Sequence, residues 1–518
     1  MRRRVSVLAV FLLLFCSGYS QRKGDIDTTN IIQQPNRIEF EMDEYGSTFH
    51  VIPGESSGIL VVQETENRSK EGFNWIFYSL DTTLTKTWTR ILVIPYEYYM
   101  IGWEYSEGKY YVLYQVDRYR GEEMMLYEID VETGNHLTYD ISTVFPISLT
   151  FFEIIDSHAV FAGYTNYRPV LLTYDLGEQK PRVVPGFYDN KSDILDIVID
   201  DEVGMFTVIQ QERTDNRRNT ISVKSFTSSG EIIQSNTINP GPRNNLVDGA
   251  STMFLNGYQY IAGTFSKNTS EYSRGLYLSK FVNGRQQFLR YHDYAELNKF
   301  FDYMGEKRVA RIKERIARKR LKGKKATFNY KLLVHDMIQR GEEYILIAEA
   351  YYPRYSTYSN QLGYAPRMGY QRMNPNFMGY KYTHAVVVAF DRNGNIIWDN
   401  SFEIDDVESF ALEDVVVVSN YGDKIVLMYM EENTIRSKVI KGDEILEGKS
   451  ISPVRLAYDS DEVRNRDPEI EGLKWWYGRT MYAFGEQRIR NEDGVGGRVY
   501  RRVFYINKIQ YHLEDIAN

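Results

Sequence analysis

The feature that most constrains this chain is a unit of roughly 40 to 50 residues that recurs along most of its length. Each unit has a half-polar strand, an apolar strand, a polar loop, a second apolar strand, a turn that usually contains Gly, and a last strand. The clearest copy predicts strands at 194–199, 205–210, 220–226 and 232–238. A turn that ends at Gly230 closes its last hairpin. One small antiparallel sheet per unit is therefore expected.

The same layout predicts eight units, at 49–93, 100–141, 151–184, 194–238, 250–291, 332–402, 415–451 and 473–511. The last unit lacks a fourth strand, and a spare strand at 37–42 precedes the first. We expect the spare strand to complete the last sheet, because closing a ring hides both sheet edges. The repeats resemble those of β-propellers in general. The predicted fold is an all-β chain with a single propeller of eight four-stranded antiparallel blades, the alternative being seven blades.

The first twenty residues predict export. Arg2, Arg3 and Arg4 precede an apolar run at 5–15, which is long enough for a signal sequence and too short to span a membrane. Small residues at Gly18 and Ser20 predict cleavage after Ser20. We therefore expect a signal peptide at 1–20, a linker at 21–35 and the propeller at 36–518. This start resembles that of exported proteins of Bacteroidota-type envelopes, which implies a periplasmic or outer-membrane-associated protein.

Cys16 is the single cysteine of the chain. It leaves open a lipoprotein alternative, in which a lipidated Cys16 begins the mature protein, and a released extracellular protein is a further alternative. Cleavage after Ser20 would remove the cysteine, so disulfides and thiol nucleophiles are not expected.

The first insertion, at 294–326, has apolar residues at helical spacing. Between Lys307 and Lys325 it holds eleven Lys or Arg and one acidic residue. We predict a basic amphipathic helix that contacts an envelope protein or an anionic membrane surface. Nucleic acid is not expected for an exported chain, and the alternative is a helix that docks on its own propeller. The candidate contact residues are Arg308, Arg311, Arg315 and Arg318.

The second insertion, at 351–383, contains eight Tyr and three Met. Such side chains dominate interface energetics, which predicts a partner-binding loop, with a glycan as another ligand class. The alternative is a plug over the propeller channel. Both insertions are expected on the same face, beside the same blade. The candidate contact residues are Tyr358, Tyr364, Tyr370, Arg372 and Tyr380.

Signals for chemistry are weak in this sequence. None of the seven histidines has a second one at metal-ligand spacing, so we expect no metal site. Nucleotide, dinucleotide and serine-hydrolase motifs are missing from the sequence, so no cofactor and no catalytic residue is assigned. The sequence therefore favours a protein that is not an enzyme, a non-catalytic envelope binding or scaffold module. The alternative is a carbohydrate-binding or glycan-hydrolysing propeller.

Overall fold

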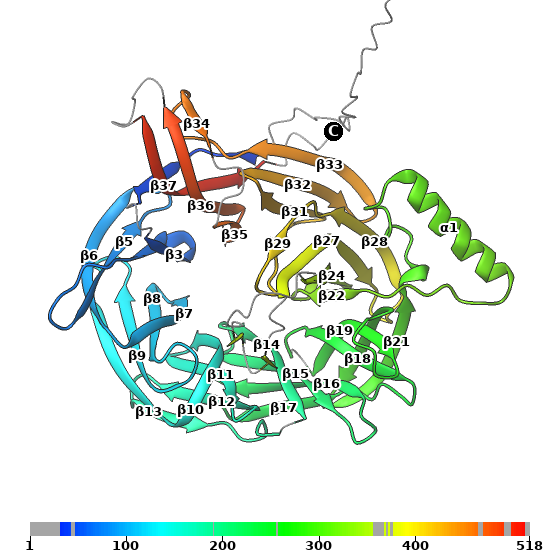
Figure 1. Ribbon diagram of the computed structural model, residues 1–518. Helices are drawn as coiled ribbons and strands as arrows, with labels where there is room; N and C mark the ends of the chain where they lie inside the picture. The colour runs from blue at the N-terminus through cyan, green and yellow to red at the C-terminus, as the bar shows by residue number, and fades with distance from the viewer. Residues whose placement is uncertain are drawn as a thin grey trace, which may run out of the picture.

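The computed structural model describes residues 32–42, 47–189, 191–254, 257–355, 367–368, 371–372, 377–464, 470–491 and 499–512. In these ranges, small antiparallel sheets stand around a common centre like the blades of a wheel (Figure 1). The predicted all-β propeller of four-stranded antiparallel sheets is confirmed. Within the same ranges, none of the helices combines the length and the apolar character that crossing a membrane requires.

Four sheets are regular blades, each with four strands paired in chain order. The first regular blade contains β3 (Thr48–Pro53), β4 (Ile59–Glu64), β5 (Gly72–Leu80) and β6 (Lys86–Pro95), with the short helix η1 (Glu55–Ser57) after β3. The second contains β14 (Ser192–Asp200), β15 (Met205–Arg213), β16 (Asn219–Thr227) and β17 (Ile232–Thr237). The third contains β18 (Asn244–Ser251), β19 (Tyr258–Lys267), β20 (Gly275–Val282) and β21 (Arg285–Asp293). The fourth contains β30 (Val417–Tyr421), β31 (Lys424–Glu431), β32 (Thr434–Lys441) and β33 (Glu444–Pro453).

A seven-stranded sheet holds two blades, because the long strand β10 (His136–Ile155) ends one blade and begins the next. The blade before this junction contains β7 (Tyr98–Ser106), β8 (Lys109–Val116) and β9 (Gly121–Asp130). The blade after it contains β11 (His158–Thr165), β12 (Arg168–Asp175) and β13 (Lys180–Val183).

Two six-stranded sheets carry additions to the blade pattern. One contains β22 (Lys331–Val334), β23 (Ile338–Arg340), β24 (Glu343–Tyr355), β27 (Phe377–Phe390), β28 (Ile396–Glu403) and β29 (Glu408–Ser409). The other contains β34 (Asp461–Val463), β35 (Glu471–Tyr477), β36 (Thr480–Asn491), β37 (Tyr500–Tyr511), β1 (Ile32–Gln33) and β2 (Arg37–Glu41). A separate two-stranded sheet pairs β25 (Arg367–Met368) with β26 (Gln371–Arg372).

One inner strand differs from the sequence prediction. The sequence predicted a strand at 250–255, whereas the inner strand of that blade is β18 at Asn244–Ser251. The apolar run near residue 250 suggested the later position. In the structure, however, Leu246 pairs with Phe265, so the more polar segment at 244–251 pairs with β19. The tertiary pairing thus overrides the local pattern.

The N-terminal strand completes the last blade, as the sequence predicted. β2 pairs antiparallel with β37, with Phe40 opposite Phe504. Pairing begins earlier than expected, because Ile32 already lies opposite Tyr511, inside the segment predicted to be a linker. The Arg37 guanidinium, 6% exposed, forms an ion pair with Glu39 at 2.7 Å and donates to Asn507 at 2.9 Å. These contacts tie the two ends of the propeller together.

The core lies between the blades. Each hydrophobic cluster in the described part of the chain joins strands of two neighbouring blades. At the closure, Phe40 and Phe49 pack with ring centroids 5.6 Å apart, and Phe49 stacks on Phe504 at 4.6 Å. The two ends are therefore sealed by the same kind of apolar contact that joins the other blades.

The basic insertion divides into an anchored half and a projecting helix. Helix η2 (Tyr294–Glu296) and the residues after it pack into the core, where Phe300 and Phe301 are buried. Tyr303 stacks on His384 with ring centroids 3.6 Å apart. The second half forms α1 (Glu306–Leu321), which has no buried residue. The prediction of a helix in the insertion at 294–326 was wrong for its first half, whose apolar residues pack into the core instead.

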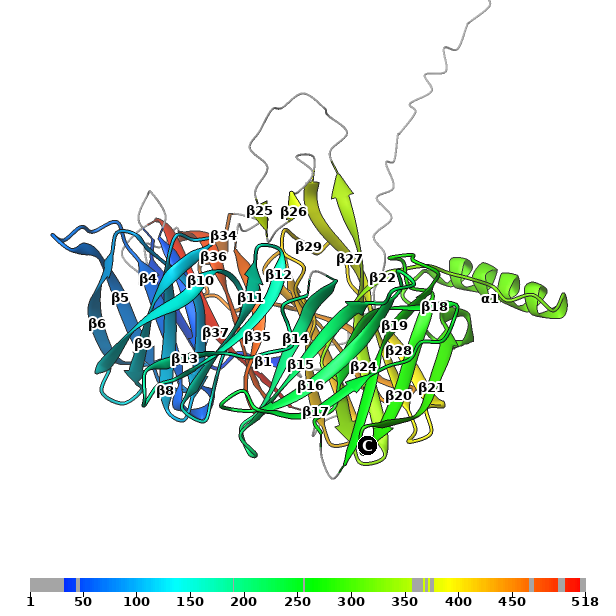
Figure 2. The same ribbon diagram turned by 90° about the horizontal axis from the view of Figure 1, so that it is seen from below.

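The first insertion connects β21 to β22, and the second lies between β24 and β27 of the following blade, so both extend beside that blade but in different directions. Figure 2 shows the β24–β27 hairpin rising from one face, while α1 projects sideways from the rim. A shared groove joins their bases, lined among others by Tyr303, Arg308 and Lys381. The described bases of both insertions therefore belong to the propeller.

We expect Phe40→Ala to lower the free energy of unfolding by about 3–5 kcal/mol, because it removes a buried ring from the closing strand. Phe40 is only 5% exposed and also packs on Tyr78, at 5.0 Å. Urea unfolding followed by tryptophan fluorescence measures the change. Ile91→Ala is the control, since Ile91 is 63% exposed on the rim strand β6. Equal loss in both variants would contradict a special role for the closing strand.

Candidate functional site

Four consecutive blades carry an acidic side chain on the strand nearest the centre of the ring. Glu104 lies on β7, and Glu153 lies on the second half of β10. Asp196 lies on β14, and Asp248 lies on β18. In Figure 1, β7 and β14 border the middle of the ring. All four residues are partly exposed as a whole, but protein surrounds most of each carboxyl group.

Local backbone irregularities place these side chains. The pairing of β14 shifts between Ile194 and Asp196, and that of β18 shifts between Leu246 and Asp248. β7 and β10 have similar shifts shortly before their acidic residue. A bulge turns the side chain that follows it, and bulges occur often beside functional sites. The carboxylate of Asp196 also accepts the backbone N–H of Ile197 at 2.8 Å, which fixes its orientation.

These acidic side chains converge on the centre of the ring. Glu153 lies within electrostatic reach of four others, Glu104, Asp196, Asp201 and Asp336. Asp336 follows β22, in a blade that is not adjacent to the blade of Glu153, so the two can approach only through the middle. Asp336 lies close enough to Asp196 to raise the pKa of its carboxyl group. We call Glu104, Glu153, Asp196 and Asp336 the channel carboxyls.

Burial and the closeness of other carboxylates raise the pKa values of these carboxyl groups by different amounts. Burial, and then the nearby carboxylates, raise the pKa of Glu153 to about 9. Burial raises the pKa of Glu104 to about 8 and that of Asp196 to about 7, with Asp336 adding to the latter. At neutral pH this group therefore holds protonated carboxylic acids beside a carboxyl group that is partly ionised.

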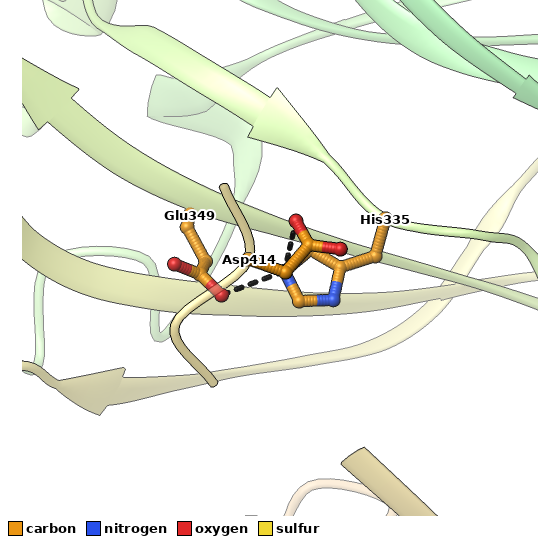
Figure 3. A group of neighbouring side chains, drawn as sticks. All are labelled: His335, Glu349 and Asp414. Carbon is orange, nitrogen blue, oxygen red and sulfur yellow. Dashed lines mark hydrogen bonds and ion pairs between the residues drawn. The ribbon is translucent and has the colours of Figure 1, made fainter. Parts of the chain in front are cut away.

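A second group brings one histidine between two carboxylates (Figure 3). His335 Nε2 lies 2.7 Å from Glu349 Oε1 and 3.3 Å from Asp414 Oδ1. Burial alone would lower the pKa of His335, but the hydrogen bond to Glu349 and the nearby carboxylates outweigh it and raise the pKa. The two carboxylates therefore favour the charged imidazole, against the effect of burial.

Asp414 connects this group to an open cleft of about 830 Å³. Its side chain is 51% exposed, whereas that of Glu349 is fully buried. The cleft is strongly acidic, with Asp406, Glu408, Glu413, Asp414, Glu431, Glu432 and Glu471 in its lining. Lys474 is the single cationic residue among the described residues of that lining. A cleft of this charge favours cationic or neutral ligands over anionic ones.

Among the described residues predicted from the insertions, none belongs to the channel carboxyls or to the group of His335. Arg308, Arg311, Arg315 and Arg318 are exposed on α1. Tyr380 is half-buried at the base of the β24–β27 hairpin, where its ring packs edge-on against Tyr351 at 5.4 Å. Arg372 belongs to β26, and Tyr358, Tyr364 and Tyr370 lie outside the described residues.

The channel carboxyls were not predicted from the sequence, although a repeated pattern pointed to them. Two units repeat a pattern of two apolar residues followed by Asp, at 194–196 and 246–248. Superposing the units would have shown that acidic residues recur near the inner strands. The group of His335 left no such signal, because its members come from positions far apart in the chain. The spacing rule for histidines on one element does not apply to it.

Comparison with known proteins gives similarity of fold. No family model and no curated protein matches the chain. Polysaccharide lyase Uly1 is 8% identical, with a TM-score of 0.38 over 91% of this chain and 100% of its own. The β-propeller domain of the Trilobed protease from Pyrococcus furiosus is 8% identical, with a TM-score of 0.34 over 79% of this chain and 93% of its own. A prolyl endopeptidase is 11% identical, with a TM-score of 0.36 over 86% of this chain. The chain spans 53% of that peptidase's length.

One expectation needs correction. The sequence analysis favoured a protein that is not an enzyme, and the comparisons contradict this. The similar structures are mostly enzymes, among them prolyl endopeptidases, an acylaminoacyl peptidase and a polysaccharide lyase. The argument from missing sequence motifs was too narrow, because a propeller can assemble carboxyl groups from separate blades without any local motif.

The raised pKa of Glu153 makes stability depend on pH. Between the ordinary value of 4.5 and about 9, the folded chain holds a proton that the unfolded chain has lost. Its contribution to stability therefore falls as the pH rises through this window. We expect the melting temperature of Glu153→Gln to fall less steeply than that of the wild type from about pH 5 to about pH 9.

Differential scanning calorimetry across this range measures the effect. Glu132→Gln is the control, because Glu132 is exposed in the turn after β9. Parallel curves for the wild type and Glu153→Gln would show that Glu153 titrates normally.

Proposed function

We propose that the channel carboxyls form the active site of a glycan-cleaving enzyme. The observation that carries the proposal is the convergence of Glu104, Glu153 and Asp196 from three blades, with pKa values spread from about 7 to about 9. Glycoside hydrolysis needs a protonated carboxylic acid and an ionised carboxylate near one bond. Unequal environments around neighbouring carboxyl groups are how proteins provide both forms at one pH.

The roles follow from the order of the pKa values. Glu153 keeps its proton at neutral pH and is assigned as the general acid, which donates to the leaving oxygen as the glycosidic C–O bond breaks. Asp196 ionises first and is assigned as the base, which takes a proton from the water that forms the new C–O bond. Glu104 adds to the field that raises the pKa of Glu153 and is assigned as a positioning residue.

The surroundings favour an uncharged or cationic glycan. Like charges repel, and the neighbouring cleft is lined mainly by acidic side chains. Exposed aromatic side chains against which a sugar ring can pack are present in the cleft and on a strand that lines it. Phe410 in the cleft is 57% exposed, and Trp475 on β35 is 47% exposed. The signal-like segment at 1–20 supports a role outside the cytoplasm, where such polymers occur.

We expect Glu153→Gln to lower the rate of glycan cleavage by about 10²–10⁴-fold, because it removes the proton donor. The assay is release of reducing ends from a panel of neutral and amino-sugar polysaccharides, together with chromogenic glycosides. Glu132→Gln is the control and retains wild-type activity. Absence of activity on every substrate, or full activity in Glu153→Gln, would overturn the assignment.

Helix α1 supports a second proposal, the docking of an acidic envelope protein. Its four arginine candidates are exposed, and its contact with the core is limited to the partly buried side chains of Ile312 and Ile316. Its ion pairs within the described chain include Lys313 with Asp302 and Arg318 with Glu314, and both pairs are solvent-exposed. Exposed pairs of this kind contribute little, so most of the positive charge stays available to a partner.

We expect charge reversal at Arg308, Arg311, Arg315 and Arg318 to abolish salt-sensitive retention of an envelope protein. The measurement is affinity capture from envelope extract of the source organism at low and high salt, followed by mass spectrometry. Charge reversal at Lys180 and Arg182, exposed on the rim strand β13, is the control. Identical captured proteins from both variants would exclude α1 as the docking element.

A further inference from the structure

The group around His335 has the geometry of a metal-binding site. Its three ligand atoms are His335 Nε2, Glu349 Oε1 and Asp414 Oδ1, and all lie within 4.8 Å of one another. They come from three separate places, the loop after β22, the strand β24 and the segment before β30. Figure 3 shows the contacts from both carboxylates meeting at one nitrogen of the imidazole. We propose that these three side chains bind one divalent transition-metal ion.

The spacing is close to what a bound ion requires. Bonds of about 2.0–2.2 Å to nitrogen and oxygen place tetrahedral ligand atoms about 3.3–3.5 Å apart. The separation of His335 Nε2 and Asp414 Oδ1, at 3.3 Å, already has this value. The 2.7 Å separation of His335 Nε2 and Glu349 Oε1 is shorter. A shift of about half an ångström in one side chain would admit the ion.

Backbone N–H groups hold the buried ligand, Glu349, in place. Glu349 is fully buried, and its Oε1 accepts the backbone N–H of Val416 at 2.8 Å. The N–H of Val415 lies within 3.1 Å of Oε1 and 3.3 Å of Oε2. The backbone N–H of His335 donates to the Ile347 carbonyl at 2.9 Å, which places the histidine against the same strand. Support of this kind around metal ligands orients them and raises affinity.

The third ligand, Asp414, connects the proposed metal site to solvent. Asp414 is half-exposed and lines the acidic cleft, so an ion can enter from solvent and keep an open coordination position there. Asp336 adds a further acidic side chain beside His335. Lys474 is a positively charged neighbour of Asp414. The negative charge of the surroundings favours a cation over an empty site.

The ligand set indicates the class of metal. One imidazole nitrogen with two carboxylate oxygens suits Zn²⁺ or Mn²⁺, whereas Mg²⁺ and Ca²⁺ prefer oxygen ligands alone. Three protein ligands and one open position are typical of catalytic rather than structural zinc sites. The ion would lie beside the channel carboxyls without sharing a ligand with them, so the proposal does not depend on glycan cleavage.

The test is isothermal titration of the full-length protein, first treated with a chelator, with Zn²⁺ and separately with Mn²⁺. We expect saturable binding of one ion per chain and a rise in melting temperature on binding. Asp414→Asn and His335→Gln are each expected to weaken binding at least 10-fold. Circular dichroism of both metal-free variants verifies that they remain folded.

The matched control is Glu432→Gln, which removes the same charge from the same cleft but not from the ligand set. It is expected to bind like the wild type. The proposal is overturned if no saturable binding occurs, which would leave His335 only as a hydrogen-bonding partner of two carboxyl groups. Equal weakening in Asp414→Asn and Glu432→Gln would also overturn it, because diffuse attraction to the acidic cleft would then explain the binding. Cleavage activity is not measured, so this result is independent of the proposed enzyme.

Discussion

Each blade of this protein covers the apolar face of the next, and no blade can bury its own core alone. The ring must therefore close, and it closes where Phe40 and Phe49 meet Phe504 and Trp476. Apolar side chains fill the spaces between the blades, and burying a charge among them is costly. Charged side chains therefore lie at the rim, on the two faces and at the centre. The acidic centre is thus a consequence of how the blades pack as well as a candidate site.

The repeat made much of the fold predictable. Strands with alternating or continuous apolar character stand out in the sequence, and the missing last strand pointed to the N-terminal segment. Prediction failed where a local pattern competed with tertiary contacts. The apolar residues of 297–304 fit a helix, yet Phe300 and Phe301 are buried against the blade instead. Local spacing cannot distinguish an amphipathic helix from a loop anchored by the same side chains.

The candidate sites were far less predictable. Glu153 and Asp336 are 183 positions apart in the sequence, as the numbering shows, and only the curvature of the ring brings them together. The same holds for His335 and Asp414, which belong to successive blades. Arginine-rich and tyrosine-rich insertions attract attention because they depart from the repeat, whereas the channel residues belong to the repeat itself. Charge is accordingly divided in space, with the positive charge of α1 at the rim and the negative charge toward the centre.

The pairing of the N-terminal strand β2 with the C-terminal strand β37 determines when the ring can close during synthesis. Arg37 reaches a partner 470 positions later, so a ribosome releases β2 long before β37 exists. Until the last blade is made, the first blade has one uncovered apolar flank and β2 has no neighbour to pair with. Contacts between such distant segments form slowly, and exposed strand edges invite aggregation in the meantime. A newly made chain would thus depend on a holding chaperone, or on late and rapid assembly, for most of its synthesis.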